Sequence, residues 1–208
     1  MARTKRDSSF IVMIKRPRIL ANAVASLLLG ALVALWGITA PESAWSSQSD
    51  SRLASLFQEL RTAPDGPSAA SVEDQIWTIW LDHPGDEVLF LMQDGVSGMN
   101  EEDYARALEA FSAVTEIAPD YAEGWNKRAN ANYLLGDYAA AVADIRRVLM
   151  LEPRHFAALA GLGLIYLELD EADGALKAFS AALAINPHLE GVREHIADLQ
   201  HQLARSTF

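Results

Sequence analysis

The stretch AEGWNKRANANYLLGDYAAAVADIRRVLMLEPR, from Ala122 to Arg154, decides the fold. It holds two helical segments around a turn at Gly136 to Tyr138, and it ends with Pro153 and Arg154. A small residue, a large apolar residue and a proline recur with a spacing of 34 residues: Ala107, Ala141 and Ala175; Phe111, Ile145 and Phe179; Pro119, Pro153 and Pro187. A fixed period in the thirties predicts stacked helical repeats, because each unit buries its apolar face only against its neighbours.

This unit resembles the tetratricopeptide repeat (TPR). Trp125 opens the first helix, Gly136 to Tyr138 makes the turn, and Ala141 lets the two helices approach closely. The resemblance implies an all-α fold, a short right-handed solenoid of helical repeats that serves as a protein–protein interaction module. The sequence has no phosphate-cradling glycine loop, serine nucleophile elbow or paired buried carboxylates, so we expect no enzymatic activity and no cofactor.

The resemblance extends to both sides of this unit. Residues 156–187 form a second clear repeat, and residues 88–119 form a degenerate one, with Asp94 and Gly98 where the pattern has larger apolar residues. The segments AEGWNKRA and LEPRHFAALAGLG also resemble small exported TPR proteins of alphaproteobacteria. That second resemblance implies a bacterial, periplasmic setting.

The amino-terminal segment has the pattern of a targeting sequence. Lys15, Arg16 and Arg18 precede an apolar run over residues 19–40, and small residues follow near Ser46. We expect residues 1–46 to be a signal peptide cleaved after Ser46, or else an uncleaved membrane anchor. Either form places the remaining chain in the periplasm, free or anchored to the inner membrane, and the true start is Met1 or Met13.

Three further regions follow the targeting segment. Residues 47–87 are expected to form a linker and an irregular helix pair, residues 88–187 the repeats, and residues 188–208 a capping helix at the carboxyl end. We interpret the helix pair as a cover on the first repeat, because a solenoid needs its apolar end sealed. The alternative is that Trp77 and Trp80 form an exposed docking patch.

Composition excludes several classes of function. The formal net charge is −11, which disfavours binding to nucleic-acid phosphates. The chain has no cysteine, so disulfides, thiolate nucleophiles and thiolate-bound zinc are excluded. Membrane contact is expected only through the amino-terminal segment, if that segment is not cleaved.

The first helices of stacked repeats line a concave face, and this face is the predicted binding groove. The residues expected to line it are Met92, Val96, Asn126, Asn130, Tyr133, Ala160, Leu164 and Leu167. An apolar floor with two amides suits an extended or helical apolar segment of a partner protein, whose identity the sequence leaves open. Related repeats clamp a terminal aspartate with Lys and Arg on this face, but Ala157 and Gly161 hold two of those positions here.

Other polar residues suggest structural roles. Arg128 stands where the TPR pattern has a packed Leu, so we expect a carboxylate or carbonyl partner, with the acidic residues Asp94 and Glu152 as candidates. Either Arg128 and its partner form a buried network that fixes two repeats together, or Arg128 is a cation of the groove. Asp120 to Glu123 resembles a capping box, and Arg154 to Phe156 reads as a solvated loop with Phe156 in the core.

Histidine supplies the enzymatic alternative. His188, His195 and His201 lie near the carboxyl end, and Asp198 is three residues from the last two. A metal-binding or enzymatic accessory domain would use these residues, although a terminal helix offers neither a third convergent ligand nor a cavity. A structural homo-oligomer is the remaining alternative.

Overall fold

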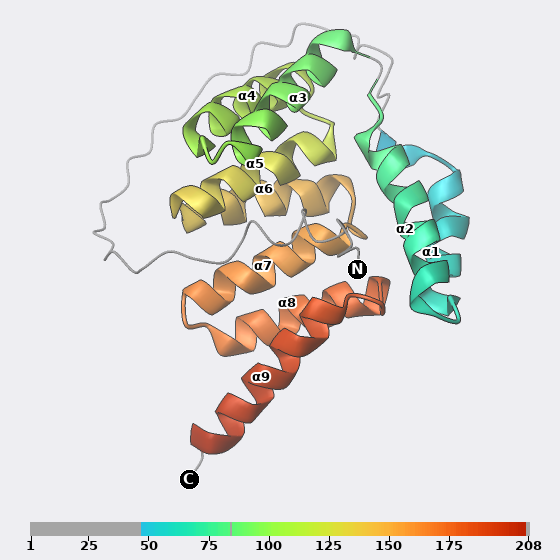
Figure 1. The fold of residues 1–208 in the computed structure, drawn as a ribbon, viewed down its shortest axis with the longest axis vertical. Coiled ribbons are helices and arrows are strands. Elements are labelled where there is room, and N and C mark those ends of the chain that lie inside the picture. Colours follow the sequence, from blue (N-terminus) through green and yellow to red (C-terminus); the bar gives the residue numbers. More distant parts are fainter. Residues whose placement is uncertain (1–46, 84, 207–208) are drawn as a thin grey trace, which may run out of the picture. The chain divides into compact units, whose positions relative to one another are not determined.

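The computed structural model describes residues 47–83 and 85–206, and within them the fold is all-α, as predicted (Figure 1). A short 3₁₀ turn, η2 (Ser47–Ser49), precedes the helices. The helices are α1 (Arg52–Thr62), α2 (Gly66–Leu81), α3 (Asp86–Asn100), α4 (Tyr104–Ile117), α5 (Ala122–Leu135), α6 (Tyr138–Leu151), α7 (Phe156–Glu168), α8 (Ala172–Ile185) and α9 (Glu190–Ser206). None of these helices is long and apolar enough to cross a bilayer. The predicted leader or anchor, residues 1–46, lies outside the described residues.

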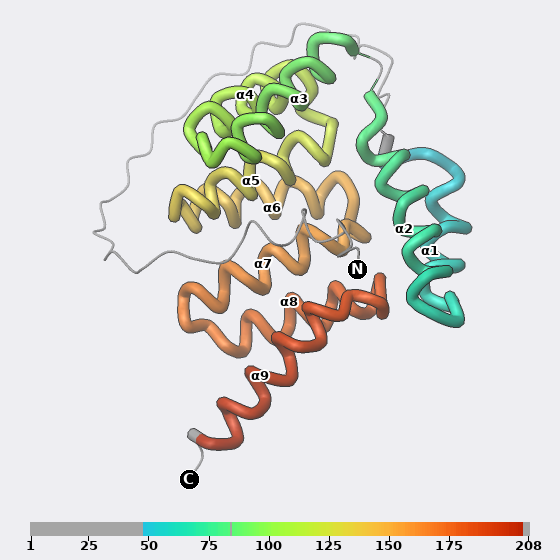
Figure 2. Tube along the Cα trace, in the orientation of Figure 1, coloured from blue at the N-terminus to red at the C-terminus, as the bar shows by residue number. Residues whose placement is uncertain are grey.

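Helices α3 to α8 form three antiparallel pairs, and each pair packs on the next (Figure 2). The pairs are α3–α4, α5–α6 and α7–α8, so each repeat has a first and a second helix. Helix α9 packs on α8 with Val192 and Leu199 buried, while Glu190 and Glu194 are exposed. This is the predicted arrangement of a solenoid with a polar carboxyl-terminal cap.

The turn inside each pair has the same backbone conformation at the same point of the period. Glu102, Gly136 and Asp170 are 34 residues apart and have φ values of 59°, 80° and 58°. These are left-handed conformations, which glycine adopts without steric cost and other residues do not. The repeat geometry therefore imposes this conformation even where the sequence has no glycine.

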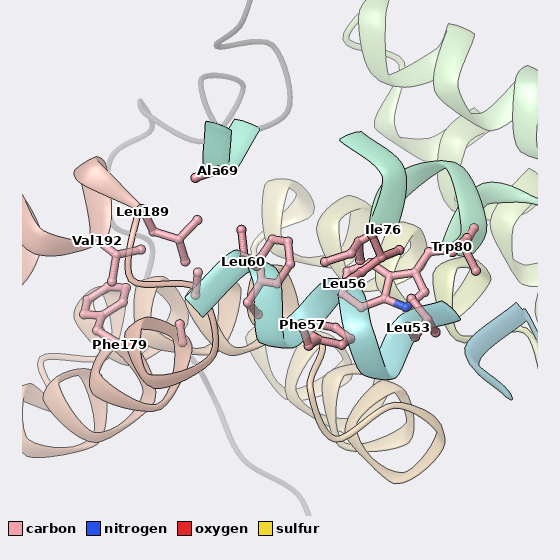
Figure 3. Packing of buried hydrophobic residues seen from close by; sticks show 14 of the residues in the cluster. Leu53, Leu56, Phe57, Leu60, Ala69, Ile76, Trp80, Phe179, Leu189 and Val192 are labelled. Atoms are coloured by element: carbon pink, nitrogen blue, oxygen red, sulfur yellow. The ribbon is translucent and has the colours of Figure 1, made fainter. Parts of the chain in front are cut away.

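The helix pair α1–α2 is not a cover on the first repeat, so that prediction is wrong. The pair runs along the connections between repeats. Gln48 donates to the carbonyl of Asp120 before α5, and Asn186, after α8, donates to Glu73 of α2 at 3.0 Å. The stripe Leu53, Leu56, Phe57 and Leu60 of α1 belongs to one core cluster with residues of α2, α7, α8 and α9 (Figure 3). Apolar burial along this side, rather than at the α3 end, fixes the position of the pair.

The two tryptophans of α2 belong to this core. Trp80 is 1% exposed, and its ring stacks on the His155 imidazole with the centroids 4.2 Å apart. Trp77 is half-buried and meets Trp80, His155 and Phe156 edge-on. The alternative of an exposed Trp77–Trp80 docking patch is therefore wrong, because the start of α7 already covers both rings.

Candidate functional site

The eight predicted groove residues divide into two groups by exposure. Four are buried and take part in the packing of the repeats: Met92, Asn126, Tyr133 and Ala160. Four keep accessible surface on the first helices of the three repeats: Val96, Asn130, Leu164 and Leu167. These accessible residues combine one amide with branched apolar side chains. A partner segment that lay across α3, α5 and α7 would meet these apolar side chains and the Asn130 amide.

Asn126 does not offer its amide to a ligand, contrary to the expectation. The side chain is 4% exposed, and its Nδ2 donates to Oε2 of Glu123 at 3.0 Å. Tyr133 is also internal: it is 8% exposed, and its hydroxyl lies 3.5 Å from Oε1 of Glu168. Burial raises the pKa of the Tyr133 phenol above its ordinary value, so the hydroxyl stays protonated. The Asn126 bond therefore lies within α5, and the Tyr133 contact joins α5 to the end of α7.

The buried polar side chains Glu123, Asn126 and His155, which we call the polar core, meet at the Glu123 carboxylate. Glu123 in the first turn of α5 is 1% exposed, and Nζ of Lys127 lies 3.1 Å from its Oε1. Burial opposes ionisation of Glu123, but the Lys127 ammonium and a hydrogen bond from His155 outweigh it, so the pKa lies below its ordinary value. The capping-box prediction is wrong at this point, because Glu123 turns inward instead of back to the backbone.

His155 joins this carboxylate to the next repeat. The backbone N–H of Ala158 donates to Nδ1 of His155 at 3.2 Å, so the imidazole caps α7. Because Nδ1 accepts, the ring proton lies on Nε2, which donates to Oε2 of Glu123 at 3.1 Å. His155 is 0% exposed, so the prediction of a solvated loop is wrong there, whereas Phe156 is in the core as expected.

Arg128 has the carboxylate partner that its position predicts, but neither named candidate provides it. Its Nε and Nη2 donate to the two oxygens of Asp144 at 2.9 and 2.6 Å, and its Nη1 donates to Thr115. The guanidinium also lies 4.6 Å from the centre of the Trp125 ring. The proposed partners have other bonds: Asp94 binds Arg106, and Glu152 binds Arg154.

These contacts decide what charge the first helices present. Within α3, α5 and α7 the only Lys and Arg residues are Lys127 and Arg128. Both are paired with buried carboxylates, Glu123 and Asp144. The described first helices therefore offer no unpaired cation to an anionic peptide terminus.

The carboxyl-terminal histidines do not gather into one site. His195 stacks on Phe179 with the centroids 5.3 Å apart, whereas His201 is exposed on the last turns of α9. Within residues 47–83 and 85–206 no three His, Asp or Glu side chains converge as a metal ion requires. The metal-binding alternative has no support from this geometry.

Comparison with known proteins identifies the repeats. The sequence model of the tetratricopeptide repeat matches residues 99–149 and 135–190. A TPR repeat-containing protein of Rhizobium etli is 34% identical over 159 residues, which are 76% of this chain and 78% of that protein. Small glutamine-rich tetratricopeptide repeat-containing protein 2 of Mycosarcoma maydis is 25% identical, over 60% of this chain and 36% of its own length.

Solved structures show the same fold. The Sgt2 TPR domain from Aspergillus fumigatus superposes with a TM-score of 0.56 at 20% identity, over 60% of this chain and 83% of that domain. The crystal structure of MamA superposes with a TM-score of 0.54 at 21% identity, over 71% of this chain and 84% of that chain. The first TPR domain of RPAP3, bound to an HSP90 peptide, superposes with a TM-score of 0.55 at 19% identity, over 57% of this chain and 94% of that domain. From its repeats and from the relative that it matches over most of both lengths, the chain belongs to the tetratricopeptide repeat family.

Proposed function

We propose that this protein is an exported adaptor or assembly factor that holds an apolar segment of a partner protein against α3, α5 and α7. Family membership supports an interaction module, since the RPAP3 domain is bound to an HSP90 peptide and a Sti1 domain of yeast forms a complex with an Hsp70 peptide. We propose no catalytic step for this module.

One observation carries the choice of an apolar ligand. Lys127 and Arg128 are held by Glu123 and Asp144, so they are not available to clamp a carboxylate. The accessible side chains on the same helices include Val96, Leu164 and Leu167. An acidic tail would find no counter-charge on these helices, whereas an apolar segment would bury surface at about 25 cal/mol per Å².

Site-specific photo-crosslinking tests this proposal in cells of the source organism. A photoreactive side chain at residue 130 or 164 should capture a partner, because both positions keep accessible surface on first helices. The same group at Glu109 or Arg146, exposed on second helices α4 and α6, is the matched control. Equal capture from the control positions, or none from residues 130 and 164, would rule out the groove.

Export is proposed from the sequence pattern of residues 1–46 and is tested separately. Cell fractionation should place the protein in the periplasm or on the inner membrane, and amino-terminal sequencing should distinguish the two. A mature chain that begins at Ser47 indicates a cleaved leader. A chain that still contains Lys15 to Arg18 indicates an anchor, and a cytoplasmic protein would refute export.

A further inference from the structure

The first helix of the solenoid has an apolar face that no described helix covers. Phe90 of α3 is 69% exposed and Leu89 is 41% exposed, and Gln93 lies beside them on the same side of the helix. Asp86 is exposed one turn before Phe90. We call Asp86, Leu89, Phe90 and Gln93 the α3 end face.

The repeat period shows what this face lacks. The residues equivalent to Phe90 in the next two repeats are Gly124 of α5 and Ala158 of α7, and both are buried. Gly124 lies directly against Val114 of the preceding helix α4, and α6 precedes α7 in the same way. Phe90 therefore occupies the position at which a first helix meets the helix before it. In the described part of the chain that place is not filled, because α1 and α2 pack along the repeat connections.

The surroundings of the face are strongly acidic. Residues 81–103 contain no Lys or Arg and have seven carboxylates: Asp82, Asp86, Glu87, Asp94, Glu101, Glu102 and Asp103. Arg106 of α4 neutralises Asp94 and Glu101, but no ion pair is recorded among the described residues for Asp86 or Glu87, which flank the apolar side chains. An apolar centre with an anionic rim complements a helix that is apolar on one side and basic at its edges.

We propose that the α3 end face is a second docking surface, which receives a cationic amphipathic helix of a partner protein. The helix would pack where the second helix of a preceding repeat would lie. This surface differs from the groove of the proposed function and does not depend on it. It also explains why a residue as large as Phe90 is exposed at a position where the other repeats have Gly and Ala.

Charge argues against two other occupants. A second copy stacked end to end would bring α9 onto α3. The exposed residues of α9 include three carboxylates, Glu190, Glu194 and Asp198, against the two cations Arg193 and Arg205, so α9 is not the basic helix that the acidic rim favours. An anionic lipid surface would meet repulsion from Asp86 and Glu87. The carboxylates of the rim attract a basic helix both during the diffusional encounter and in the bound complex.

Fluorescence anisotropy with the full chain tests the proposal. The probe is a labelled peptide of about 18 residues made of Leu and Lys, with Leu at helical i, i+3 and i+4 spacing. Phe90→Ser should weaken its binding about tenfold or more. Met150→Ser on α6 should leave the binding of the peptide unchanged, although Met150 is also an apolar side chain and is 63% exposed. Asp86→Asn with Glu87→Gln should weaken binding and reduce its dependence on salt.

Each contrary result has a definite meaning. Equal binding of a scrambled peptide with the same composition, or equal loss in Met150→Ser, would overturn the proposal. Sedimentation velocity that shows a dimer dissociated by Phe90→Ser would assign the face to a second copy and overturn it as well. Binding to phosphatidylglycerol vesicles that Phe90→Ser abolishes would assign it to lipid. An unchanged circular dichroism melting curve for Phe90→Ser excludes misfolding as the cause.

Discussion

Gly163 of α7 lies directly against the ring of Phe179 in α8, and a Cβ atom at residue 163 would collide with Cδ1 and Cε1 of that ring. Gly95 has the same relation to Phe111 in the first repeat. The middle repeat has Ala129 and Ile145 at the equivalent positions, both buried. The two helices of each repeat therefore pack closely at a small residue of the first helix, and the size of that residue matches the side chain opposite it on the second helix.

Gly163→Ala is expected to lower the free energy of unfolding by about 2 kcal/mol, because the added methyl group forces the Phe179 ring to move. The double variant Gly163→Ala/Phe179→Ile should recover most of the loss, since it copies the Ala–Ile pair of the middle repeat. Urea unfolding followed by circular dichroism measures both. The control is Gly161→Ala, where the new Cβ would meet only Cδ1 of Ile145 at 3.8 Å. A double variant less stable than the single one would contradict size matching.

The 34-residue period predicts the repeats because helix packing is local in sequence. Each alanine and large apolar residue of the pattern contacts a residue in the same repeat or the next one, so spacing alone brings them together. The close contact of Gly163 with Phe179 is of this local kind. Gly161, two residues earlier in the same helix, has no such close contact, and its position leaves room for a side chain.

The polar core could not be predicted in the same way. Glu123 and His155 are 32 residues apart, and Trp80, which stacks on His155, comes from a helix outside the repeats. Local rules favour a capping box for Glu123, but the ion pair with Lys127 and the long-range hydrogen bond from His155 override them. The sequence does contain a signal for the pairing of Asp144 with Arg128, because the residues equivalent to Asp144 in the other repeats are Ala110 and Ala178. Arg128 and Asp144 are thus two oppositely charged departures from the pattern in one repeat, which indicates an ion pair.

Arg128→Leu is expected to lower the free energy of unfolding by about 3 kcal/mol, because it leaves the Asp144 carboxylate, 4% exposed, without its bidentate cation. Adding Asp144→Ala should restore most of that stability, since the pair then matches Leu162 and Ala178 of the next repeat. Asp144→Ala alone should also destabilise. Denaturant unfolding of the four proteins gives the coupling energy. Additive losses would show that the two side chains do not act as a buried pair.

Glu102→Gly is expected to raise the free energy of unfolding by about 0.5 to 1 kcal/mol. Glu102 has a φ of 59°, and glycine adopts that conformation without the clash of a Cβ, as Gly136 does at 80°. The matched control is Gly136→Ala, which should destabilise by a similar amount. Thermal unfolding compares the variants. A lower melting temperature for Glu102→Gly would show that its carboxylate contributes more than the backbone strain costs.

Acid should weaken the fold through Glu123. The pKa of this buried carboxyl is held below its ordinary value of 4.5, since Lys127 and His155 outweigh the effect of burial. For a carboxyl with a lowered pKa, the stabilisation is complete above the unfolded value and is lost as the pH falls through the folded value. The melting temperature of the wild type should therefore fall below about pH 4.5.

Glu123→Gln isolates this effect, because glutamine keeps an acceptor for the His155 N–H but cannot ionise. Its melting temperature should lie below that of the wild type at neutral pH, and the two should converge as the medium is acidified. Glu109→Gln, at an exposed position of α4, should follow the wild type throughout. If the gap between Glu123→Gln and the wild type stayed constant down to about pH 3, the ion pair with Lys127 would not be the source of the acid sensitivity.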